Sequence, residues 1–71
     1  MSKKELWFVE GLFNLVGTTF AMCTTKEKAK DAVGILEGEG LKNMLEINHG
    51  NALVDDIAVN NVVVNGRLVE L

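Results

Sequence analysis

Residues 24–37 have the sequence Thr-Thr-Lys-Glu-Lys-Ala-Lys-Asp-Ala-Val-Gly-Ile-Leu-Glu, the clearest helix signal in the chain. Thr24 and Glu27 have the spacing of a capping box, in which each side chain bonds a free backbone N–H of the first turn. Spacings of three and four residues then put the apolar side chains in one stripe: Ala29, Ala32, Val33 and Leu36. We predict one helix over about residues 25–37, ended by the glycines that follow it.

A β-hairpin is predicted close to the C-terminal end of the chain. Asn65-Gly66 separates the apolar run 62–64 from the run 67–69. Asn-Gly favours a type I′ turn, which needs positive φ at both central residues. The expected cross-strand pairs are Val63 with Leu68 and Val62 with Val69. Because an isolated hairpin is only marginally stable, this one must pack on the helix or pair with further strands.

The N-terminal third allows two interpretations. Residues 6–9 and 16–23 favour strands that form a hairpin closing around residues 11–14. Alternatively, Ser2 and Glu5 form a second capping box, and the apolar spacing fits a helix over residues 3–16. We favour the strands, because a helix would have to contain Gly11 and three aromatic residues.

The remaining segment is expected to complete a sheet. Residues 44–48 are predicted as a strand that ends in a turn at His49-Gly50-Asn51. Residues 52–59 fit either continued strand or a helical turn or tight bend at Asp55-Asp56. The predicted fold class is α+β: a single domain over residues 1–71 with a small, meandering antiparallel sheet and one helix packed across it. The predicted order is β-β-α-β, a short turn, and a β-β hairpin.

Composition excludes several classes of site and partner. With one cysteine, Cys23, and one histidine, His49, the 71-residue chain can form no internal disulfide and lacks the preferred ligands of a zinc site. The net charge of −3 and the scattered Lys and Arg residues argue against nucleic-acid binding. No phosphate-binding or dinucleotide motif is present, so we predict no cofactor. So short a chain needs either self-association or an unusually apolar core, and the 48% hydrophobic content fits both; we predict a homodimer.

One apolar segment requires a membrane test. Residues 6–23 carry a single charge, Glu10, behind a lysine-containing start, which superficially resembles a signal peptide. Glu10, Asn14 and two glycines interrupt the apolar run, however. We therefore predict a cytoplasmic protein with no membrane association.

The runs Leu-Trp-Phe-Val-Glu-Gly (6–11) and Thr-Phe-Ala-Met-Cys-Thr-Thr-Lys-Glu-Lys-Ala-Lys-Asp-Ala-Val (19–33) resemble a pattern in small uncharacterised bacteriophage and prophage proteins. In those proteins an aromatic-rich hairpin leads into a Thr/Ser-x-Glu-x-Ala helix and further short strands. The resemblance covers roughly residues 5–36. It implies an accessory protein of a phage or mobile element and supplies no catalytic residues.

Four residues have the chemistry of a site, and each has a simpler explanation. Asp55 and Asp56 are paired carboxylates, but adjacent residues rarely point at one cation, so a solvated bend is expected. His49 lacks a designated partner and is expected to be an exposed turn residue. Cys23 lies near a helix N-terminus, which favours a thiolate, yet it is in phase with Ala21 on a predicted strand and is expected in the core.

Apolar residues near the N-terminus are the best candidates for a partner-binding surface: Trp7, Leu12 and Phe13. Large apolar side chains are unusual in a hairpin connection, and exposed ones mark interaction sites. Packing against the core is the equal alternative. We therefore predict a non-enzymatic protein-interaction module that binds a host or self partner. The alternative is a small enzyme or ligand-binding protein whose site, with Cys23 or Asp55 and Asp56, forms at a homodimer interface.

Overall fold

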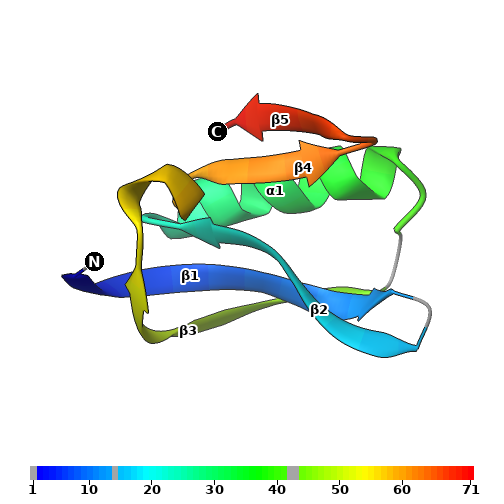
Figure 1. The fold of residues 1–71 in the computed structure, drawn as a ribbon. Coiled ribbons are helices and arrows are strands. Elements are labelled where there is room, and N and C mark those ends of the chain that lie inside the picture. The colour runs from blue at the N-terminus through cyan, green and yellow to red at the C-terminus, as the bar shows by residue number, and fades with distance from the viewer. Residues whose placement is uncertain (1, 14, 42–43) are drawn as a thin grey trace.

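The computed structural model describes residues 2–13, 15–41 and 44–71, in which five strands form one antiparallel sheet with one helix packed on one face (Figure 1). The strands are β1 (Ser2–Phe13), β2 (Val16–Cys23), β3 (Leu45–Val54), β4 (Asn61–Val64) and β5 (Arg67–Glu70). Helix α1 (Lys26–Gly38) follows β2, and a 3-10 turn, η1 (Asp56–Ala58), follows β3. The α+β class and the order of elements are confirmed.

The sheet is not a meander, and that prediction is wrong. Its strand order is β3-β1-β2-β4-β5, so the chain returns after α1 to the outer edge of β1 and then crosses to the far side of β2. β3 pairs with β1 from Ser2 to Gly11, almost the full length of β1. The long, continuous edge of β1 therefore decides where β3 docks.

The N-cap of helix α1 lies one residue later than predicted. Thr25 is the N-cap, and its Oγ1 accepts a hydrogen bond from the backbone N–H of Lys28 at 3.2 Å. The prediction of a Thr24–Glu27 capping box is wrong, because Thr24 donates to Asn60 instead. Its backbone N and its Oγ1 lie 2.9 and 3.2 Å from Asn60 Oδ1. A contact 36 residues away in sequence thus selects between two adjacent threonines.

The C-terminal end of α1 follows the expected glycine chemistry. Gly40 has φ 101°. Its N–H donates to the carbonyl of Glu37 at 3.0 Å, and the N–H of Leu41 donates to that of Leu36 at 3.2 Å. These two bonds are a Schellman motif, which satisfies carbonyls that have no partner inside the helix.

The N-terminal residues form a strand, and the alternative helix over residues 3–16 is wrong. Leu6 and Val9 are both fully buried, but on opposite faces of the sheet in two separate clusters. Residues three apart share one face of a helix, so the same spacing suggested a helix in the sequence. β1 also extends beyond the predicted residue 9: Leu12 and Phe13, placed by the prediction in the connection, are paired strand residues.

β3 continues through residues predicted to form a turn. His49, Gly50 and Asn51 pair with Trp7, Leu6 and Glu5 of β1, so the predicted turn and the expected turn position of His49 are wrong. Residues 52–54 continue the strand, and the chain then bends into η1, which resolves the ambiguity over residues 52–59. The composition of 48–51 is typical of a turn, but an uninterrupted partner strand keeps it extended.

A bulge explains the twist of the sheet. The β1–β2 register passes from Val9–Ala21 to Glu10–Thr19, which leaves Phe20 as an extra residue. A bulge bends the strand and increases its twist. β2 accordingly curves away from β4 in Figure 1, and the two strands pair in register only at Ala21 and Val62.

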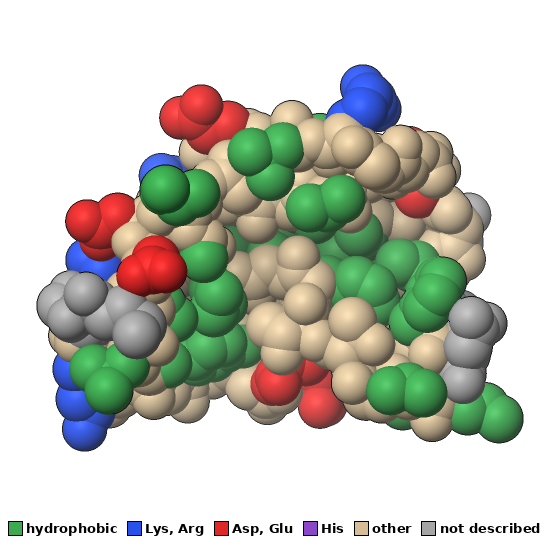
Figure 2. All heavy atoms as spheres, in the orientation of Figure 1, with side chains coloured by type: hydrophobic (Ala, Val, Ile, Leu, Met, Phe, Trp, Pro, Cys, Tyr) green, Lys and Arg blue, Asp and Glu red, His purple; other side chains and the backbone are tan. Residues whose placement is uncertain are grey.

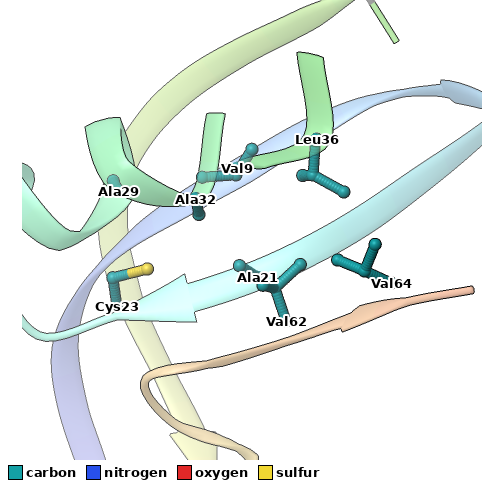
Figure 3. Close-up of a cluster of buried hydrophobic side chains, with 8 residues drawn as sticks. All are labelled: Val9, Ala21, Cys23, Ala29, Ala32, Leu36, Val62 and Val64. Atoms are coloured by element: carbon teal, nitrogen blue, oxygen red, sulfur yellow. The ribbon is translucent and has the colours of Figure 1, made fainter. Parts of the chain in front are cut away.

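The main core lies between α1 and the sheet (Figure 3). The predicted stripe of α1 is confirmed. Its buried members pack on inward-facing strand residues, and the cluster is Val9, Ala21, Cys23, Ala29, Ala32, Leu36, Val62 and Val64. A smaller cluster of Leu6, Val54 and Val59 lies on the other face. The predicted C-terminal hairpin is also confirmed in its register and in the positive φ angles of Asn65 and Gly66.

Candidate functional site

The three residues predicted to bind a partner are not brought together. Trp7 is half-buried and stacks on His49, with ring centroids 4.0 Å apart and planes 7° from parallel. Lys26 Nζ lies 5.8 Å from the centroid of the Trp7 ring. Trp7 lies six strand residues, about 20 Å, from Phe13. Since its ring is engaged within the chain, we leave Trp7 out of the candidate surface.

Leu12 and Phe13 belong to a group of exposed apolar residues around the end of the β1–β2 hairpin, which we name the hairpin-end patch. As consecutive strand residues they point to opposite faces of the sheet, so the patch extends around this end of the hairpin. Its members are Leu12, Phe13, Leu15, Val16 and Met44, with exposed fractions of 48, 54, 91, 63 and 48%. Figure 2 shows hydrophobic side chains at this end of the hairpin, in the lower right of the view. Exposed apolar side chains that cluster in this way mark interaction surfaces.

Leu15 is the most unusual member of the hairpin-end patch. It is the residue before β2, has φ 67°, and exposes 91% of its surface. The left-handed conformation costs a non-glycine residue about 1–2 kcal/mol, and glycine is the usual occupant of such a position. Leu15 therefore combines backbone strain with full exposure of an apolar side chain. The apolar run around the connection was visible in the sequence, but the φ angle was not.

An open hollow of about 770 Å³ adjoins the hairpin-end patch. The hollow is lined by Leu12 and Met44 of the patch and by Glu10 and Glu46, among others. Asn48 Nδ2 donates to both carboxylates, at 2.8 and 3.3 Å. The apolar patch is therefore bordered by negative charge on the face of the sheet opposite α1.

A second apolar surface lies where β2 and β4 diverge. A groove of about 190 Å³ is lined by Phe20, Met22, Ile57, Val63 and Leu68, among others. Small-molecule sites usually enclose about 300–1,000 Å³, so this groove is too small for most of them. Ile57, Val63 and Leu68 are nevertheless largely exposed, at 85, 61 and 66%.

Cys23 is a core residue, as expected. It is free and fully buried in the main cluster. Burial raises the pKa of its thiol; Lys28 opposes that shift and Asp31 adds to it. A thiol of raised pKa that no reagent can reach is a poor nucleophile.

We expect Cys23 to react with a thiol reagent such as DTNB at least tenfold more slowly in the folded protein than in urea at the same pH. Burial blocks access, and the raised pKa reduces the thiolate fraction. Absorbance at 412 nm follows the reaction. Equal rates in the folded and unfolded chain would contradict the assignment of Cys23 to the core.

The other candidate groups are engaged separately. Asp56 pairs with Lys4 of β1 at 3.0 Å, and His49 Nε2 lies 2.7 Å from Glu5 Oε1. Asp55 precedes η1 and is exposed. Among the described residues, no three His, Cys, Asp or Glu side chains are grouped so that they could hold a metal ion. The paired carboxylates and the histidine therefore do not converge.

Fold and surface together define a small α+β domain with an exposed apolar hairpin end. No protein-family model matches the chain, and no curated protein or solved structure matches it. In residues 2–13, 15–41 and 44–71, no helix combines the length and the apolar character needed to cross a membrane.

Proposed function

We propose that this protein is a non-enzymatic interaction module that binds a partner protein through the hairpin-end patch. The observation that carries the proposal is Leu15, an almost fully exposed leucine at φ 67°. Strained residues tend to occur at functional sites, where the strain is offset by a gain elsewhere. Binding a partner would bury Leu15 together with Phe13 and Val16.

The charge around the hairpin-end patch defines the chemistry of the partner. Glu10 and Glu46 border the patch and line the hollow beside it, where Asn48 donates a hydrogen bond to each carboxylate. A segment with apolar side chains beside a lysine or arginine would match this surface, because opposite charges steer and orient association. An accessory role in a phage or mobile element, in the cytoplasm, belongs to the same proposal.

Partner capture with matched variants tests the proposal. Tagged wild-type protein, the patch variant Leu12→Ser/Phe13→Ser and the control variant Val63→Ser/Leu68→Ser are used as baits in the same cell lysate. Both variants convert two exposed apolar residues to serine. We expect a protein retained by wild type and control and lost, by tenfold or more, from the patch variant. A partner retained equally by all three baits, or none retained by wild type, would contradict the proposal.

Leu15→Gly separates binding from stability. Glycine relieves the left-handed strain but costs more chain entropy, so we expect a net gain of about 0.5–1 kcal/mol and a Tm higher by a few degrees. The same variant should weaken partner capture. The converse control is Gly66→Leu: Gly66 has φ 76° and open space around it, so leucine should lower the Tm by a similar amount. An unchanged or lower Tm for Leu15→Gly would remove the strain argument.

A further inference from the structure

The two edges of the sheet differ in length and in charge. β5 is four residues long and carries Arg67 and Glu70. β3 is ten residues long, and its one acidic residue is Glu46; it contains no lysine and no proline. Short length, charge and proline are the devices that keep an edge strand from pairing with another chain. β5 has two of these devices, whereas β3 is open to pairing along its outer side.

β3 is also complementary to itself. When two copies run antiparallel with Gly50 opposite Gly50 of the second copy, Ile47 faces Leu53 and His49 faces Asn51. In these two pairs an apolar residue opposes an apolar one and a polar residue opposes a polar one; Asn48 then faces Ala52, Glu46 faces Val54, and no like charges meet. Residues directly opposite in an antiparallel pair contact one another, so the Ile47–Leu53 and His49–Asn51 pairs favour this register. It also covers Leu53, which is 66% exposed.

From this edge we infer that the protein forms a two-fold homodimer in which β3 pairs antiparallel with β3 of a second copy, giving one continuous ten-stranded sheet. A ten-residue strand is about 33 Å long, which matches the 32 Å long axis of the molecule. The side of the molecule along this axis measures 32 by 21 Å, or about 670 Å². Stable interfaces bury about 600–1,000 Å² per partner, so this side lies within that range when the second copy covers all of it. This surface is distinct from the hairpin-end patch.

Molar mass by light scattering tests the interface. We expect wild type at about 15 kDa, twice the 7.7 kDa chain. Leu53→Lys places a lysine from each copy in the interface and should give 7.7 kDa monomers. The matched control is Leu68→Lys, since Leu68 is also a leucine of an edge strand and is also 66% exposed; it should stay dimeric. A monomeric wild type would overturn the inference. A Leu53→Lys variant that stays dimeric, while Leu68→Lys or Leu12→Ser/Phe13→Ser becomes monomeric, would also overturn it.

Thiol cross-linking tests the register of the proposed pairing. It remains informative even when the Leu53→Lys variant does not fold. In the proposed pairing the two Cα atoms of residue 50 lie about 4.5–5.5 Å apart, within disulfide reach. A Cβ at Gly50 would lie 3.5 Å from Phe8 Cε2, an ordinary contact, so cysteine fits there. Under diamide, which oxidises two thiols to a disulfide, Gly50→Cys should give mostly covalent dimer. Asn48→Cys should give little, because residue 48 lies four residues, about 13 Å, from its copy. Equal cross-linking of both variants would overturn the proposed register, and no cross-linking of Gly50→Cys would overturn the pairing.

Discussion

Gly11→Ala is expected to lower the free energy of unfolding by about 3 kcal/mol. A single hydrophobic core in a domain of this size contributes only about 3–5 kcal/mol of stability, so this loss would be most of it. A Cβ at Gly11 would overlap the carbonyl oxygen of Met44, and it would also lie 3.1 Å from Leu45 Cδ2. The obstacle is backbone at the start of β3, so no side-chain rotation can remove it. β1 and β3 would have to separate at this end of the sheet.

Urea unfolding followed by circular dichroism measures this effect, with Gly17→Ala as the control. Gly17 lies in β2, near Gly11 across the hairpin, but an added Cβ there meets no atom within 4 Å. We expect Gly17→Ala to stay within about 0.5 kcal/mol of wild type. A Gly11→Ala protein as stable as Gly17→Ala would mean that β3 does not approach β1 as closely as described.

Leu6→Ala is expected to lower the free energy of unfolding by about 2–5 kcal/mol. Leu6 is fully buried and forms the cluster with Val54 and Val59, on the face of the sheet that α1 does not cover. Removing its side chain leaves a cavity beneath the bend that joins β3 to β4. With so little total stability, the variant should be partly unfolded at 25 °C.

Leu68→Ala provides the matched control, because Leu68 is 66% exposed and its truncation leaves no internal cavity. It should change the stability by about 0.5 kcal/mol or less. The same urea titration compares the two variants. If Leu6→Ala were no more destabilising than Leu68→Ala, the second core cluster would not contribute to stability.

The sequence predicts those residues of the candidate surface that are large and apolar and lie near an expected turn. Large apolar residues in an expected hairpin connection predict exposure of Leu12 and Phe13, whose exposed fractions are 48 and 54%. Trp7 is predicted with them because tryptophan is enriched in binding hot spots. The strand separates it from them, because six residues span about 20 Å when extended but far less in a helix or loop. Leu15 gained its importance only from its φ angle.

Helix α1 with its apolar stripe and the hairpin of β4 and β5 follow from local sequence patterns. The stripe, the glycine after the helix and the Asn-Gly turn all act over a few residues. Tertiary structure alone decided the choice of Thr25 over Thr24 as cap, the extended conformation of His49-Gly50-Asn51 and the position of β3 beside β1. Each of these depends on a partner distant in the chain: Asn60 for the threonines, and the length of β1 for β3. A backbone N–H or carbonyl must find a partner, and which partner it finds depends on how the strands assemble.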